Sequence, residues 1–195
     1  MSDASDLTEF LTARRQPGAD RAAIDAAIFA RFGRMQAVMF TDLVGFSRLV
    51  EAFGIVHFLQ LIQESESVFL PLVRQHGGTC LKQEGDSLLA VFDAPAAALA
   101  TARAMVSATQ ALNPGRSGED RIEVCIGLGF GQVLRVGDDE VWGAQVNAAS
   151  KLGEEMAHGG EILVTEEFQR ALPDEPFEPH GTLFNNQAAL RLVKV

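Results

Sequence analysis

The stretch AVMFTDLVGFS, residues 37–47, joins a run of strand-forming apolar residues to a carboxylate and then to a glycine. The apolar run predicts a short buried strand over residues 36–40, and a helical pattern begins at Ser47. Asp42 stands at the mouth of this strand, where an unpaired charge is costly. The stretch therefore indicates a strand that delivers a carboxylate to a strand–helix junction, together with a positively charged group that meets it there.

Strand and helix patterns alternate on both sides of this junction. Ile24, Ile28 and Phe32 have helical spacing, so a helix is expected within residues 19–35, after a polar segment, 1–18, that we expect to be a flexible arm. The further expected elements are a helix over 47–75 kinked at Pro71, a hairpin over 79–92, a helix over 94–112, one or two strands over 121–136, a helix over 141–156, a strand over 161–165, a helix over 166–172 and a strand pair over 182–195. This order predicts an α+β domain over residues 36–195, with a mixed or antiparallel sheet and helices on one face.

The composition excludes several classes of protein. The chain has 195 residues, with 26 acidic and 16 basic side chains and a net charge of −10, which argues against general nucleic-acid binding. The start lacks the pattern of a signal peptide, and no apolar run is long enough to cross a membrane. Cys80 and Cys125 lie in strand-like runs and are expected to be free, buried thiols. We therefore expect a soluble cytoplasmic protein.

A second acidic residue is predicted to lie near Asp42. Asp86 occupies the tip of the expected hairpin over 79–92, and in a β-α-β-β arrangement its strand can pair with the strand that carries Asp42. Two adjacent carboxylates suit divalent cations such as Mg²⁺, and backbone N–H groups near Gly45 suit phosphate. On the residues alone, Asp42 as a helix N-cap and Asp86 as a turn residue explain the pattern equally well.

Five segments decide between these alternatives. FTDLVGFSRL, HGGTCLKQEGDSLLAVFDAPAAAL, IGLGFGQV, VWGAQVNAASKL and GGEILVTEE resemble, in order and spacing, the class III adenylate/guanylate cyclase catalytic domain. The resemblance covers about residues 36–195. It implies the ferredoxin-like βαββαβ core of that fold, and active sites at the interface of a head-to-tail homodimer. It also implies that Asp42, the Leu43 carbonyl and Asp86 hold two Mg²⁺ or Mn²⁺ ions, while the backbone at Gly45, Phe46 and Ser47 cradles the triphosphate.

The resemblance also assigns residues that recognise the base. Lys82 stands where adenylate cyclases place the lysine that contacts adenine N1, and a lysine donor suits adenine better than guanine. ATP is therefore the expected substrate. Glu140 stands where these enzymes commonly have aspartate or threonine, as the acceptor for the adenine amino group. The longer Glu140 side chain either keeps this role or is a solvated loop acid.

Three positions depart from the family pattern. Asn147 matches the asparagine that orients the ribose, but the transition-state arginine expected one turn later is Lys151, which lacks the planar bidentate fork. Lys151 either contacts phosphate or pairs with Glu154 or Glu155 on an exposed helix face. Phe184 replaces a phosphate-contacting lysine, and Glu84 adds negative charge beside Asp86. All three departures are expected to weaken the binding of a polyanion such as a triphosphate.

Three functions remain open from the sequence. The first is an active adenylate cyclase that forms cyclic AMP and pyrophosphate by two-metal-ion catalysis. The second is a cyclase-fold nucleotide-binding or regulatory module that has lost turnover, as Lys151 and Phe184 suggest. The third is a cyclase with altered base choice, which rests on Glu140. Trp142 is expected to pack in the core or an interface, and the glycines of residues 127–131 are expected to mark bulges or close packing within a strand.

Overall fold

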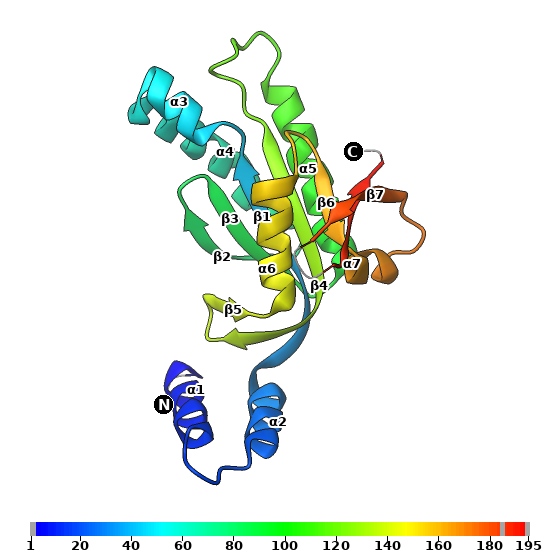
Figure 1. Ribbon diagram of the computed structural model, residues 1–195. Helices are drawn as coiled ribbons and strands as arrows, with labels where there is room; N and C mark the ends of the chain where they lie inside the picture. The colour runs from blue at the N-terminus through cyan, green and yellow to red at the C-terminus, as the bar shows by residue number, and fades with distance from the viewer. Residues whose placement is uncertain (1–2, 184–185, 194–195) are drawn as a thin grey trace.

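The computed structural model of the protein describes residues 3–183 and 186–193, with the backbone alone at residues 46 and 47. In these residues eight strands form one mixed sheet of order β2-β3-β1-β4-β6-β8-β7, with β5 paired to β4 (Figure 1). The strands are β1 (Gly33–Leu43), β2 (Thr79–Glu84), β3 (Ser87–Phe92), β4 (Val124–Val136), β5 (Glu140–Trp142), β6 (Ile162–Thr165), β7 (Phe177–Thr182) and β8 (Ala188–Leu192). Only β4 and β6 pair in parallel among the described strands.

The helices follow the expected order. They are α1 (Asp3–Arg14), α2 (Arg21–Phe32), α3 (Phe46–Phe53), α4 (Ile55–Gln75), α5 (Pro95–Leu112), α6 (Ala144–Lys151) and α7 (Glu166–Ala171), with a π-helical turn, η1 (Leu152–Met156), directly after α6. The order of strands and helices confirms the predicted α+β fold.

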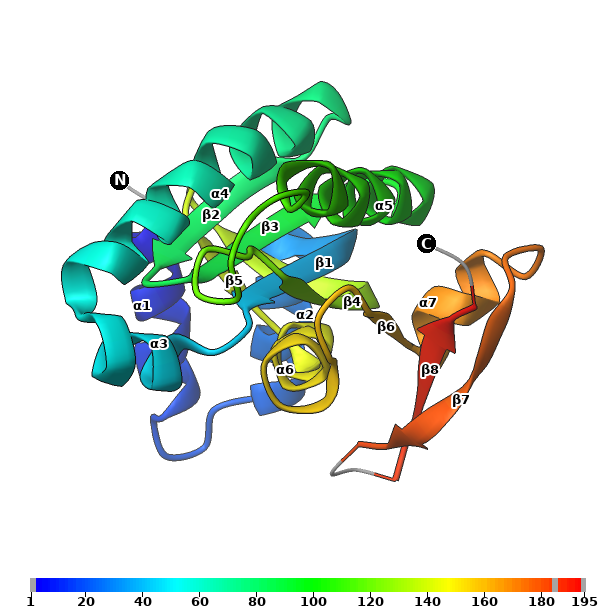
Figure 2. The ribbon, with the colours of Figure 1, turned by 90° about the horizontal axis from the view of Figure 1, so that it is seen from above.

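The two faces of the sheet carry different helices. Figure 2 shows α4 and α5 on one face and α6 on the other, so the expectation that helices cover one face is wrong. The side chains of β1 explain this, because successive residues of a strand point to opposite faces. Ala37 and Met39 join the core beneath α4 and α5, whereas Val38 packs in a second cluster with Ala149 of α6.

Helix α6 lies unusually close to the sheet because β4 presents glycines to it. A Cβ at Gly127 would lie 2.0 Å from the Ala149 carbonyl oxygen, and one at Gly129 would lie 2.7 Å from the Gln145 carbonyl oxygen. The close packing expected for these strand glycines is therefore confirmed. It fixes the height of α6 above the sheet, and with it the position of every side chain that α6 presents.

Residues 3–14 differ from the expected flexible arm, because they form helix α1. This helix folds back on α2: Leu7 and Phe10 pack against the cluster of Ile28, Phe32 and Val136. The Phe10 and Phe32 rings meet edge to face with their centroids 6.4 Å apart.

Ion pairs hold the same two helices together. Arg31 of α2 pairs with Asp3 and Asp6 of α1, and Arg14 of α1 pairs with Asp25 of α2. The sequence argument failed here because the apolar stripe of α1 is short and becomes evident only against α2. The helix expected within 19–35 is α2, and its apolar face packs on α1 and the end of β4.

Other boundaries also differ from expectation. The helix expected over 47–75 is divided at Gly54, whose φ of +85° ends α3 and starts α4. Pro71 lies inside α4. Val141 and Trp142 belong to β5 rather than to the following helix, and the last strand pair begins at Phe177, five residues before the expected start.

The close approach of α6 yields a stability prediction. Gly127→Ala should lower the free energy of unfolding by about 2 kcal/mol, because the new methyl group would overlap the Ala149 carbonyl oxygen. Urea denaturation followed by circular dichroism measures the change. Gly118→Ala is the control, since a Cβ there meets nothing within 4 Å, and it should change stability by less than about 0.5 kcal/mol. Equal effects of the two substitutions would contradict the packing argument.

Candidate active site

Asp42 and Asp86 lie at the same end of two paired strands. The antiparallel register of β1 and β3 places Thr41 opposite Leu88, so Asp42 and Ser87 come next at that end. Ser87 Oγ donates a hydrogen bond of 3.1 Å to Asp42 Oδ1. Asp86 directly precedes Ser87 in the tight turn after β2, where Gly85 has a φ of +61°. Sheet pairing therefore brings together two acids that are 44 positions apart in the chain.

The environment of both acids favours their neutral forms. Burial and, after it, the nearby charges of Asp86 and Glu154 raise the pKa of Asp42 to about 6, although hydrogen bonds from Ser87 and from the backbone at Leu43 lower it in part. Burial and the charge of Glu154 also raise the pKa of Asp86. Carboxylates that destabilise one another in this way gain from a bound cation, which removes the repulsion.

The chain leaves Asp42 through a loop that ends at a helix N-terminus. Val44 N–H donates to the Glu123 carbonyl, and Gly45 has a φ of +93°, which places it in the left-handed region. Gly45 precedes α3, and its carbonyl accepts the first helical hydrogen bond, from Leu49 N at 2.8 Å. Phe46 and Ser47 form the first turn of α3, with their side chains outside the description. The first-turn N–H groups of such a helix can donate hydrogen bonds to a bound anion.

A groove runs between the β2–β3 hairpin and α6. It consists of two adjoining hollows of about 440 Å³ and 390 Å³, which share Lys82, Leu89, Val146 and Asn147 as walls. The first hollow extends to Asp86, Ser87, Ser150 and Glu154, and the second extends to Glu140 and Trp142. Lys82, Glu140 and Asn147, all singled out from the sequence, therefore line one continuous depression.

One end of this groove is acidic, and a lysine lies in its middle part. Glu84, Asp86 and Glu154 line one end. Asp42 lies nearby, where burial and the charges of Asp86 and Glu154 raise its pKa. Lys82 is half exposed in the shared middle part, where its Nζ lies 4.0 Å from Glu84 Oε1. The acidic end would repel a triphosphate in the absence of cations.

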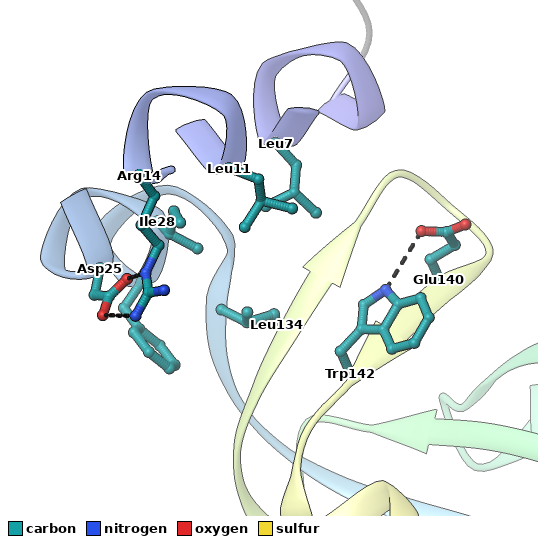
Figure 3. Close-up of a pocket in the computed structure, with 9 residues that line it drawn as sticks. Leu7, Leu11, Arg14, Asp25, Ile28, Leu134, Glu140 and Trp142 are labelled. Atoms are coloured by element: carbon teal, nitrogen blue, oxygen red, sulfur yellow. Dashed lines mark hydrogen bonds and ion pairs between the residues drawn. The ribbon is translucent and has the colours of Figure 1, made fainter. Parts of the chain in front are cut away.

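Glu140 and Trp142 belong to the short strand β5. The Trp142 indole N–H donates to Glu140 Oε2 at 3.4 Å, as Figure 3 shows. Trp142 is 58% exposed, so the expectation of core packing is wrong and only the expectation of interface packing stays open. Glu140 is half-buried and lines the groove, so it is not a freely solvated loop acid.

Glu154 and Glu155, which follow Lys151 on η1, point in different directions. Lys151 forms an ion pair with Glu155, as the non-catalytic alternative from the sequence anticipated. Glu154 points instead toward the groove, where Ser150 Oγ donates to its Oε2 at 3.0 Å. Glu154 and Ser87 are the site residues that the sequence argument missed. Helical periodicity does not predict the direction of Glu154, because this residue lies in the π-helical turn η1.

The donor set fits a cation held by two carboxylates and by groups from a substrate. Within residues 3–183 and 186–193, no group of three or more His, Cys, Asp and Glu side chains is placed to hold a metal ion by itself. Asp42 and Asp86 supply hard oxygen ligands of the kind that Mg²⁺ and Mn²⁺ prefer. Mg²⁺ commonly binds one or two carboxylates together with substrate phosphates, so this pair is sufficient for such a site.

Two further expectations concern residues near the site. Cys80 and Cys125 are free thiols, as expected. Cys125 is buried beside Asp42, and burial raises the pKa of its thiol to about 12. Cys80 is only partly buried, so the expectation of burial is wrong for this residue. Phe184, expected in place of a phosphate-contacting lysine, lies outside the described residues.

Comparison with known proteins identifies the family. Residues 33–184 match the family described as the adenylate and guanylate cyclase catalytic domain. The chain belongs to this family. It is similar to an adenylate cyclase of Streptomyces coelicolor, with 36% identity over 120 residues, and to a putative adenylate cyclase of Rhizobium meliloti, with 29% identity over 133 residues.

The matched segments cover 61% and 68% of this chain but only 29% and 22% of those two relatives. Among solved structures, an adenylate/guanylate cyclase/hydrolase from Silicibacter pomeroyi is 28% identical, with a TM-score of 0.68 over 82% of this chain and 95% of that one. The similarity is thus to a domain that the curated relatives carry within much longer chains. None of the helices in the described ranges is both long enough and apolar enough to cross a bilayer.

The raised pKa of Asp42 predicts a gain in stability when its charge is removed. An acid with a raised pKa holds its proton more tightly in the folded protein, so stability falls as the pH rises from about 4 to about 6. Asp42→Asn keeps an acceptor for Ser87 and removes this cost. In EDTA at pH 7.5 the free energy of unfolding should rise by about 1 kcal/mol, since partial exposure screens much of the shift.

Urea denaturation at pH 7.5 and at pH 4 measures this effect, with Asp174→Asn on an exposed loop as the matched control. The gain from Asp42→Asn should largely vanish at pH 4, which lies below the raised pKa of Asp42, so that its carboxyl group is mostly protonated in the folded protein. Mg²⁺ should stabilise the native protein more than the variant. A gain that persists unchanged at pH 4 would show that its origin is not the carboxylate charge.

Proposed function

We propose that the chain is an adenylate cyclase domain, which converts ATP to 3′,5′-cyclic AMP and pyrophosphate. The observation that supports this most directly is the meeting of Asp42 and Asp86 at one end of a groove whose other parts include Lys82 and Asn147. Membership of the cyclase family and similarity to adenylate cyclases agree with it.

Two divalent cations would be held by Asp42, the Leu43 carbonyl and Asp86. Mg²⁺ or Mn²⁺ bound there supplies electrostatic stabilisation of the attacking and leaving oxygens. The mutual repulsion of Asp42, Asp86 and Glu154 supports this assignment, because a bound cation relieves it. The loop from Gly45 through Phe46 and Ser47 would accept the triphosphate on backbone N–H groups.

The base and ribose would be recognised by the remaining groove residues. The ammonium group of Lys82 would donate to adenine N1, and the Glu140 carboxylate would accept from the adenine amino group. Asn147 would orient the ribose. Lys82 and Glu140 share the walls of one hollow, which supports their acting as a pair. Guanine carries a hydrogen-bond donor at N1, which cannot pair with the Lys82 ammonium group because that group is also a donor.

The reaction breaks one bond of ATP and forms another. The ribose 3′-oxygen attacks the α-phosphorus, the bond from that phosphorus to the α–β bridging oxygen breaks, and pyrophosphate leaves with both electrons of that bond. Asp42 would accept the hydroxyl proton or orient the hydroxyl group. Lys151 would balance charge on the phosphate, for which it would have to exchange its ion pair with Glu155.

A second copy of the chain would complete each site. Lys82 and Asn147 are exposed in the single chain, and the groove is open to solvent along the face that carries them. Head-to-tail pairing would set the acidic end of one groove toward the part of its partner's groove that contains Lys82. A homodimer would then carry two sites, and its facing grooves would exclude water from the reacting atoms.

Two observations favour a second candidate function, a cyclase-fold module that binds nucleotide without turning it over. Lys151 is paired with Glu155, and Glu84 and Glu154 add negative charge near the metal-binding acids. Both features reduce the positive charge available to a transition state. The third hypothesis, altered base choice, rests on Glu140, whose carboxylate still has the polarity that the adenine amino group requires.

Activity measurements distinguish these candidates. With Mn²⁺ or Mg²⁺ and each of ATP, GTP, CTP and UTP, cyclic AMP from ATP should be the main product, measured by chromatography. Asp42→Ala should lower the rate by at least about 10²-fold, because the cation ligand is lost. Asp174→Asn is again the matched control and should leave the rate unchanged. Metal-dependent binding of ATP without any cyclic product would favour the regulatory module.

Base preference tests the role of Lys82. Lys82→Glu reverses the polarity of the group facing N1, so the ratio of kcat/KM for ATP over GTP should fall about tenfold or more. Lys82→Met removes the charge without reversing polarity and should reduce the rate with ATP without favouring GTP. An unchanged ratio in Lys82→Glu would contradict the proposed contact.

A further inference from the structure

A separate cavity lies between the N-terminal helices and the β4–β5 hairpin. This hairpin cavity, of about 550 Å³, is shown in Figure 3 and is lined by Leu7, Leu11, Arg14, Asp25, Ile28, Phe29, Leu134, Glu140 and Trp142. Its volume is within the range of small-molecule sites. Leu11, Phe29 and Trp142 are each more than 40% exposed, which leaves large apolar groups in contact with water. The cavity adjoins the groove described above and shares Glu140 and Trp142 with it, but the acidic end at Asp86 is not part of the cavity.

The polar groups at the two ends of the hairpin cavity differ in their charge balance. At one end Arg14 donates to both oxygens of Asp25, at 2.5 Å and 3.0 Å, so the two charges neutralise each other. At the other end Glu140 accepts only a long hydrogen bond from the neutral Trp142 indole. Across the described residues no ion pair involves Glu140. The cavity therefore has an apolar middle and one uncompensated negative end.

We propose that the hairpin cavity binds a small amphiphilic cation, an amine attached to an apolar body. The apolar body would lie against Leu7, Leu11 and Leu134, and the ammonium group would pair with the Glu140 carboxylate. The exposed Trp142 ring beside Glu140 adds a cation–π surface at the same place. An anionic ligand would be repelled by the Glu140 carboxylate, and a neutral ligand would leave that carboxylate without a counter-charge.

The position of Glu140 gives this site a consequence for nucleotide binding. Glu140 and Trp142 line both the hairpin cavity and the groove that contains Lys82 and Asn147. An ammonium group bound to Glu140 would compete for the carboxylate that we assign to the adenine amino group. The bound amine would thereby weaken ATP capture; this step alone rests on the proposed function.

Binding can be measured without any cyclase activity, because Trp142 is the only tryptophan in the chain. The probes are 4-phenylbutylamine, 4-phenylbutanol and 4-phenylbutyrate, which share one apolar body and differ in charge. In the absence of nucleotide, the amine should change Trp142 fluorescence saturably, with at least about tenfold higher affinity than the alcohol or the acid. No saturable change up to about 1 mM amine, or equal binding of amine and acid, would overturn the proposal.

Two variants locate the contacts. Glu140→Gln should reduce binding of the amine about tenfold and leave that of the alcohol unchanged. Leu11→Gln, which keeps helix propensity but removes an apolar wall, should weaken both amine and alcohol severalfold. Leu59→Gln is the matched control, since Leu59 is a similarly exposed leucine on α4 outside the cavity. Circular dichroism verifies folding, and undiminished amine binding in a folded Glu140→Gln would overturn the proposal.

The effect on nucleotide capture is measured separately. The amine should raise the KM for ATP in the native protein and have a severalfold smaller effect in Leu11→Gln, whose activity without amine should be normal. Saturable binding without any cyclase product would defeat the proposed function and leave the binding site standing. Cyclase activity without amine binding would do the reverse.

Discussion

The pairing of β1 with β3 is the constraint on which the rest of the site depends. An aspartate at the end of a buried strand is costly alone, and the charge of Asp86 at the adjoining turn adds to this cost, in line with the raised pKa of Asp42. Ser87 offsets part of this cost with one hydrogen bond. The sheet thus holds two like charges together by backbone pairing, which is strong enough to impose an arrangement that the side chains oppose. Such strained acid pairs suit a site that a cation completes.

The second constraint is the height of α6 above the sheet. Gly127 and Gly129 have no side chain to keep the helix away, and the carbonyls of Ala149 and Gln145 occupy the space that a Cβ would need. This approach brings Asn147, Ser150 and Glu154 over the edge of the β2–β3 hairpin and so creates the groove. The π-helical turn after Lys151 then sends Glu154 toward the acids, while Glu155 pairs with Lys151. Backbone packing, and not any attraction among these polar side chains, decides which of them meet.

Much of this arrangement was predictable from local sequence. The apolar run before Asp42, the turn at Gly85-Asp86 and Pro95 at a helix start each specify their structures through short-range rules, and the juxtaposition of Asp42 with Asp86 follows from the order of elements. Lys82, Glu140 and Asn147 could be grouped only through the family resemblance, because their meeting depends on how α6 packs. Helix α1 was missed because its stripe of Leu7 and Phe10 has meaning only against α2. Glu154 was missed because its direction is set by the π-helical turn, which helical periodicity does not foresee.

The distribution of charge along the groove bears on how two chains would associate. Carboxylates gather at the end near β1, and Lys82 lies in the part that adjoins Glu140. If two such grooves faced each other in the same orientation, their acidic ends would lie opposite each other. A two-fold axis reverses one groove relative to the other, so that the acidic end of each meets the lysine of its partner. In the head-to-tail pair that we propose, Lys82 of one chain would offset part of the acidic end of the other, and cations would offset the rest, because the chain has fewer basic than acidic side chains.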